Sequence, residues 1–175
     1  MNTKVRLGLA AVVIVGVVGY HILFVDDAEV LRFNDTLVEY SNRAVRSDEA
    51  FFKELEKYTD GQQVNVQILE KRRDSFAKSA ARNRGEINKM AVPDCEFCRR
   101  FHASVLKFID GKIRIAEGLK GVVQIVEANN PGGEVETAKI GSLIGTLLIQ
   151  DEQLYTVVGN EQQNLAREYG LKMKK

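Results

Sequence analysis

Residues 7–25 read LGLAAVVIVGVVGYHILFV, a run of 19 residues without a single Asp, Glu, Lys or Arg. As a helix this run would extend roughly 28 Å, which is close to the thickness of the hydrocarbon core of a bilayer. Basic residues precede it and Asp26 and Asp27 follow it, and the basic flank of a membrane helix stays in the cytoplasm. We therefore predict a single-pass signal-anchor helix over residues 7–25 in the cytoplasmic (inner) membrane, with residues 1–6 on the cytoplasmic side.

Two other interpretations of residues 7–25 are open. A cleaved signal peptide needs small residues before the cut and has an apolar core of about 7–15 residues; residues 17–19 (VVG) make a poor cleavage site. A buried core helix would carry a polar outer face, which this run lacks. An uncleaved anchor is favoured, and it places residues 26–175 outside the cytoplasm, in the periplasm or its equivalent.

The chain after the anchor has the features of an all-α domain. The whole sequence has only two prolines and no tryptophan, which favours long helices. Apolar residues recur every seven positions over residues 28–58, at Val30, Leu37, Ala44, Phe51 and Tyr58. Breakers at 59–61, 93–94 and 129–133 then divide the chain. We predict an antiparallel four-helix bundle with helices over 28–58, 62–91, 94–128 and 134–169. Heptad spacing also suits a coiled coil with a partner, but later helices of the same chain can cover these apolar residues.

Charge is distributed unevenly along the predicted bundle. Residues 26–60 hold ten acidic and five basic residues, whereas residues 61–92 hold seven basic and three acidic ones. Opposite charge predicts that the first two helices lie side by side. The basic residues are interpreted as a solvated face or as a surface for anionic lipid headgroups or cell-wall polymer; the candidates are Lys71, Arg72, Arg73, Lys78, Arg82 and Arg84.

Nucleic acid is not an expected partner. The formal net charge is only +1, so there is no overall attraction to a polyanion. No aromatic residues alternate with the basic ones in the way that a single-strand binding surface requires.

Glycines inside the last two predicted helices suggest close packing. Glycine costs about 1 kcal/mol relative to alanine in a helix interior, yet Gly118 and Gly121 precede the turn at 129–133 and Gly141 and Gly145 follow it. Small residues that face each other let helix backbones approach closely. A hairpin about this turn would place Gly121 opposite Gly141. An alternative, that residues 140–149 dip into the membrane, meets the difficulty that ten residues are too few to span it.

The segment CEFCRRFH, residues 95–102, is the cluster most suited to chemistry. On a helix Cys95, Cys98 and His102 share one face in its first turns. One hypothesis is a structural disulfide between the two cysteines, which an oxidising compartment would favour. A second is a thiol–redox site, although the strand context of thioredoxin-like sites is absent. A third is a weak metal site at all three residues, which lacks a fourth ligand.

No catalytic motif accompanies this cluster, so we expect no enzymatic activity and no cofactor. The sequence predicts a membrane-anchored helical scaffold or protein-interaction module on the outer side of the membrane. Its expected partners are membrane lipid through residues 7–25 and a protein partner or a second copy of the chain. The alternative is an extracytoplasmic thiol-redox or metal-binding protein that uses the CxxC…H cluster.

Overall fold

The computed structural model describes residues 28–130 and 132–170, which fold into helices without strands. This confirms the all-α class and the helical bundle for the described part of the chain. None of the described helices is long and apolar enough to cross a membrane, and the predicted anchor at residues 7–25 lies outside the described residues. The helices are α2 (Ala28–Arg46), α3 (Glu49–Thr59), α4 (Val66–Ile87), α5 (Glu96–Ala128) and α6 (Glu134–Glu168).

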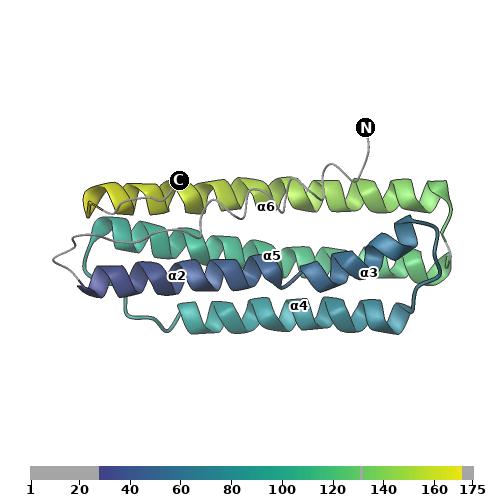
Figure 1. The fold of residues 1–175 in the computed structure, drawn as a ribbon, viewed down its shortest axis with the longest axis horizontal. Coiled ribbons are helices and arrows are strands. Elements are labelled where there is room, and N and C mark those ends of the chain that lie inside the picture. The colour runs from purple at the N-terminus through teal and green to yellow at the C-terminus, as the bar shows by residue number, and fades with distance from the viewer. Residues whose placement is uncertain (1–27, 131, 171–175) are drawn as a thin grey trace.

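The helices form an elongated antiparallel bundle of four rods (Figure 1). Helices α2 and α3 lie end to end along one rod, and α4, α5 and α6 then run back and forth beside it. Helix α5 is the central rod, because it packs extensively against both α4 and α6 and also contacts α2. Short connections between consecutive helices enforce this up-and-down order.

The first rod differs from the predicted continuous helix over residues 28–58. It breaks at Ser47 and Asp48, where the Ser47 hydroxyl donates a hydrogen bond of 2.6 Å to the carbonyl of Ala44. The carbonyl of Asp48 then accepts from the amides of Phe51 and Phe52, at 3.0 and 3.1 Å, and so begins α3. The Ser47 side chain thus competes with helical hydrogen bonding at the end of α2, whereas the Asp48 side chain makes no cap hydrogen bond to α3. The apolar heptad continues across the break, which is why the pattern did not reveal it.

The core consists of two apolar clusters, one at each end of the bundle. The first lies among α3, α4, α5 and the beginning of α6 and includes Phe51, Tyr58, Phe76, Leu119 and Ile140. The second lies among α2, the end of α4, the first half of α5 and the end of α6, and includes Phe33, Leu37, Phe101, Phe108 and Leu165. Polar contacts occupy the boundary between them, at the break between α2 and α3.

Helices α5 and α6 form the predicted hairpin, but the facing of its glycines was predicted incorrectly. A Cβ placed on Gly118 would lie 3.0 Å from both methyl carbons of Leu147, and one on Gly121 would lie 4.0 Å from Leu143. Gly141 and Gly145 have no atom within 4 Å of such a Cβ. Gly118 therefore accommodates Leu147 of α6, because the register of the hairpin differs by two to three residues from the predicted one.

Candidate functional site

The two cysteines lie where α5 begins, and their sulfur atoms are joined in a disulfide with an S–S distance of 2.10 Å. Cys95 is the N-cap residue of α5, and its Sγ accepts a hydrogen bond of 2.9 Å from the amide of Cys98. Cys98 is fully buried, whereas Cys95 is partly exposed. Of the three hypotheses for this cluster, the disulfide is the one that the structure contains, and it fixes the first turn of the central helix.

His102 does not join the cysteines as a metal ligand. Its Nε2 lies 2.9 Å from the carbonyl oxygen of Ile87, one of the last-turn carbonyls of α4 that lack a partner within their own helix. Its ring centroid lies 6.2 Å from that of Phe33. Over the described residues, no group of three or more His, Cys, Asp or Glu side chains could hold a metal ion. The weak metal hypothesis for Cys95, Cys98 and His102 is therefore not supported: the sulfurs are engaged in a disulfide and the imidazole connects α5 to the end of α4.

The predicted basic surface of α4 divides into separate groups. Arg73 forms an ion pair with its neighbour Asp74, and Arg84 forms one with Asp110 of α5. Lys71 and Arg72 are exposed near the beginning of the helix. Lys78 and Arg82 instead line a groove between α4 and α2.

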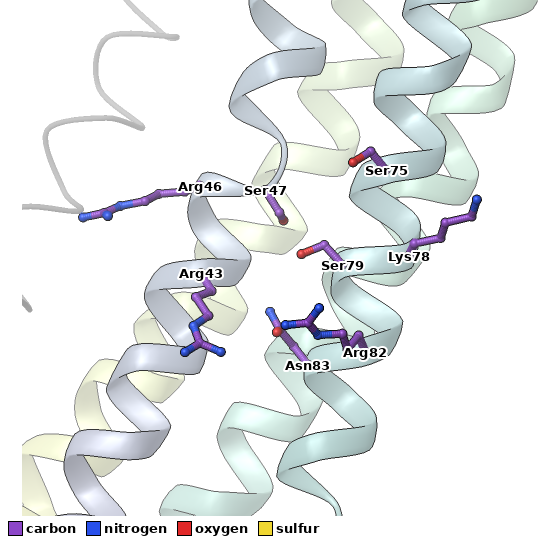
Figure 2. Close-up of a pocket in the computed structure, with 8 residues that line it drawn as sticks. All are labelled: Arg43, Arg46, Ser47, Ser75, Lys78, Ser79, Arg82 and Asn83. Carbon is purple, nitrogen blue, oxygen red and sulfur yellow. The ribbon is translucent and has the colours of Figure 1, made fainter.

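This groove has a volume of about 600 Å³ and is shown in Figure 2. Four of its eight lining residues are basic and none of the eight is acidic; they are Arg43, Arg46, Ser47, Ser75, Lys78, Ser79, Arg82 and Asn83. Basic residues of α2 thus lie opposite basic residues of α4, although α2 belongs to the acidic part of the sequence. Sequence reasoning missed Arg43 and Arg46 for this reason. Their spacing of three residues beside buried Ala44 was the available indication that they share one side of α2.

The side chains of the groove are arranged as a set of hydrogen-bond donors. In Figure 2 the Arg82 guanidinium extends from α4 towards α2 beside the Asn83 amide, and Arg43 lines the α2 wall. Arg46 and Lys78 extend outwards from the two rims. Asn83 is only 3% exposed, and its side-chain nitrogen has no hydrogen-bond partner among the described residues.

Two glutamates at the rim partly neutralise the groove. Glu39 forms an ion pair with Arg43 one turn away, and Glu86 lies 3.3 Å from Nε of Arg82. Hydrogen bonding to Glu39 raises the pKa of Arg43, so this side chain is always charged. Arg43 also lies over the ring of Tyr40, 5.3 Å from its centroid. The pKa of the Tyr40 hydroxyl is raised by burial and by the nearby Glu86 carboxylate.

A second polar group is buried at the boundary of the two core clusters. The Lys112 ammonium, on a residue that is 3% exposed, donates to Asp48 at 3.0 Å and to Asp151 at 2.8 Å. Burial lowers the pKa of Lys112, but the two carboxylates outweigh it and raise the pKa above its usual value. Burial raises the pKa of Asp48; the Lys112 ammonium opposes this rise, and the Asp151 carboxylate adds to it. The sequence did not single out this group.

Comparison with known proteins adds no relative. No protein-family model matches the chain, and neither the curated proteins nor the solved structures contain a match.

Proposed function

We propose that this protein is a membrane-tethered helical scaffold that binds a protein partner on the outer side of the cytoplasmic membrane. The observation that carries the proposal is the outward side of α6. Four of the five large apolar side chains that are exposed in the described part of the chain belong to this helix: Val135, Leu143, Ile149 and Val157. At 100° per residue these four positions fall within an arc of about 120°.

Exposed apolar side chains on one side of a helix are typical of a contact surface. Helix α6 is 35 residues long but has only five buried residues, so most of its surface remains available. The disulfide at the start of α5 supports an oxidising, extracytoplasmic location. The apolar run at residues 7–25 supports the tether.

The proposal is tested by site-specific photo-crosslinking in intact cells. A photoreactive residue replaces Ile149 or Val157, which are 59% and 47% exposed, and the matched control replaces Asp35, an exposed residue of α2. We expect an adduct of defined mass from both α6 positions and none from Asp35. An adduct of twice the chain mass would identify a second copy as the partner. No adduct from α6, or the same adducts from Asp35, would contradict the proposed contact surface.

The tether is tested separately in the same cells. We expect the full chain to remain with the membrane after alkaline carbonate extraction, and a C-terminal tag to be digested by protease added to spheroplasts. A chain recovered in the soluble fraction would contradict the tether, and a tag protected from protease would contradict the orientation.

The geometry of the cysteines favours a second candidate function, thiol–disulfide exchange. Cys95 is partly exposed at the beginning of a 33-residue helix while Cys98 is buried, and a helix N-terminus stabilises a thiolate. A thiolate of a dithiol partner would attack Sγ of Cys95, break the S–S bond and release Cys98 as a thiolate. The second thiolate of the partner would then displace Cys95. The partner would leave as a disulfide, and Cys95 and Cys98 would become a dithiol.

The two functions differ in the redox behaviour of the cysteines. The full chain is equilibrated in glutathione buffers of graded potential, acid-quenched and alkylated. Exchange predicts a dithiol form at cytosol-like potentials and a trapped mixed disulfide in a Cys98→Ser variant. A structural disulfide predicts an oxidised pair throughout, with little change in partner crosslinking when both cysteines are replaced by serine.

A further inference from the structure

We infer that the groove between α2 and α4 binds a phosphate-bearing ligand, with the guanidinium groups of Arg43 and Arg82 and the buried amide of Asn83 as its donors. This inference concerns a different surface from the outward side of α6 and does not depend on the proposed function. It also does not depend on the tether.

Like charges from two helices meet at this groove. Basic residues of two helices line one groove, and no acidic residue is among the eight that line it. A chain selected only for stability would place the acids of α2 opposite the bases of α4, because like charges at close range repel. Local arrangements that oppose stability in this way occur at functional sites. Glu39 and Glu86 each pair with one of the four basic residues, and an anion in the groove would balance the positive charge that remains.

The buried side-chain amide of Asn83 is a second feature of the groove that points to a ligand. Its side-chain nitrogen is buried and has no hydrogen-bond partner within the described residues, and Figure 2 shows its amide beside Arg82 in the space between the two helices. An unpaired buried donor is costly in a folded protein. A ligand oxygen in the groove would satisfy it. This observation is independent of the charges, because the amide is neutral.

The hydrogen-bond donors of the groove match the chemistry of phosphate. Guanidinium groups present planar pairs of N–H donors that match the oxygens of phosphate. The hydroxyl of Ser79 lies in the same space in Figure 2, and Lys78 stands at its rim. Ser47 lies on the opposite side, but its hydroxyl already donates to the carbonyl of Ala44. Such a set of donors from two helices suits a tetrahedral oxyanion better than a planar carboxylate. A volume of about 600 Å³ exceeds that of a single phosphate, so the groove has room for a ligand that carries its phosphate on a larger body or as a chain.

Two acids already pair with the proposed donors, Glu39 with Arg43 and Glu86 with Arg82. Glu86 lies 3.3 Å from Arg82 and is half-exposed, so its carboxylate occupies a donor that the ligand would use. Exposed pairs of this kind contribute little to stability, so the ligand can displace Glu86 readily. Removing this carboxylate should therefore strengthen ligand binding, which distinguishes a ligand site from a structural ion pair.

The experiment uses the full chain in micelles of a non-ionic detergent. Two probes, tripolyphosphate and a short-chain phosphatidylglycerol, are titrated separately, and binding is followed by calorimetry. We expect Arg43→Gln combined with Arg82→Gln to weaken binding by about tenfold or more. The matched control, Lys71→Gln combined with Arg72→Gln, removes the same charge from the exposed beginning of α4 and should change affinity by less than about twofold at physiological salt. Glu86→Gln should increase affinity.

Asn83→Leu provides the second readout. It removes the unpaired donor without changing charge, so we expect it to raise the melting temperature of the free protein and to weaken binding of the same probe. A role in folding alone would not move stability and affinity in opposite directions. Binding of only tripolyphosphate would assign the site to a soluble phosphate compound, and binding of only phosphatidylglycerol would assign it to a lipid headgroup.

Three results would overturn the inference. The first is that neither probe binds. The second is that the Lys71 and Arg72 control loses as much affinity as the Arg43 and Arg82 variant. The third is that Asn83→Leu leaves affinity unchanged.

Discussion

Lys112 of α5 donates a hydrogen bond of 3.0 Å to Oδ2 of Asp48, a residue 64 positions earlier in the chain, at the break between α2 and α3. The same ammonium donates to Asp151 of α6 at 2.8 Å. One buried cation therefore connects three of the four rods at the boundary between the two apolar clusters. Breaking a buried ion pair by removing one partner is strongly destabilising, so this group lends itself to a direct test.

Replacement of Lys112 by methionine should lower the free energy of unfolding by about 3–5 kcal/mol. The variant leaves two carboxylates buried near each other without a cation. Lys107→Met is the matched control, because Lys107 lies on the same helix but is exposed, and it should change stability by less than about 0.5 kcal/mol. Denaturant unfolding of the full chain in non-ionic micelles, followed by far-UV circular dichroism, measures both. Equal effects of the two substitutions would show that the ion pair is dispensable.

The pKa of Asp48 predicts a specific pH dependence. Burial raises this pKa above its usual value of 3.8, so the folded state favours the protonated carboxyl. The stability that follows from this shift is fully present below pH 3.8 and is lost as pH rises through the folded-state pKa. The free energy of unfolding of the wild type, minus that of Asp48→Asn, should therefore increase as pH falls from 7 towards 4. A difference that is flat or decreases over this range would contradict the raised pKa.

The turn between α5 and α6 is fastened to the connection between α3 and α4 by Asn130. Its side-chain nitrogen donates to the carbonyl of Val64 at 2.6 Å, and its oxygen accepts from the amide of Val64 at 3.1 Å. Asn130→Ala removes both bonds and should destabilise the protein by about 2 kcal/mol. Asn129→Ala is the control, since the side-chain nitrogen of Asn129 donates to the carbonyl of Ile125, one turn earlier in the chain. This substitution should lower the free energy of unfolding by less than about 1 kcal/mol. Thermal and denaturant unfolding measure both variants. Similar losses of stability in the two variants would show that the Asn130–Val64 hydrogen bonds do not fasten the turn.

Two glycines should respond to alanine in opposite directions. A Cβ on Gly145 meets no atom within 4 Å, so Gly145→Ala should stabilise α6 by about 0.5–1 kcal/mol through lower entropy of the unfolded chain. A Cβ on Gly132 would lie 2.2 Å from the hydroxyl of Tyr58, whose fully buried side chain cannot yield easily. Gly132→Ala should destabilise by about 1–3 kcal/mol. A loss of stability in Gly145→Ala would contradict the open space at Gly145 and support the close helix packing that the sequence predicted there.

The sequence predicted the helices and their antiparallel order well, because both depend on local physical chemistry. Apolar spacing defines helical faces, and the breakers at Gly61, Pro93 and residues 129–133 separate one helix from the next. The pairing of Cys95 with Cys98 was also accessible, since a separation of three residues at a helix start keeps the two sulfurs close. The anchor at residues 7–25 and the outer location remain predictions.

The rotation of each helix about its own axis could not be predicted from the sequence. Opposite net charges predicted that α2 and α4 would complement each other, yet Arg43 came to lie on the side that faces Arg82. Net charge is summed around the whole helix, whereas a groove samples only one side of it. In the same way, Gly118 faces Leu147 rather than a glycine, because a shift of two to three residues in the hairpin changes every facing pair.

The amino-acid sequence by itself determined which parts of the chain are helical, the turns that separate the four rods and the closeness of the two cysteines, since each of these depends on neighbours a few residues apart. Only the tertiary structure decided which side chains from different helices meet, namely Lys112 with Asp48 and the basic residues of α2 with those of α4. These meetings depend on register and rotation, which the packing of the whole core fixes at once.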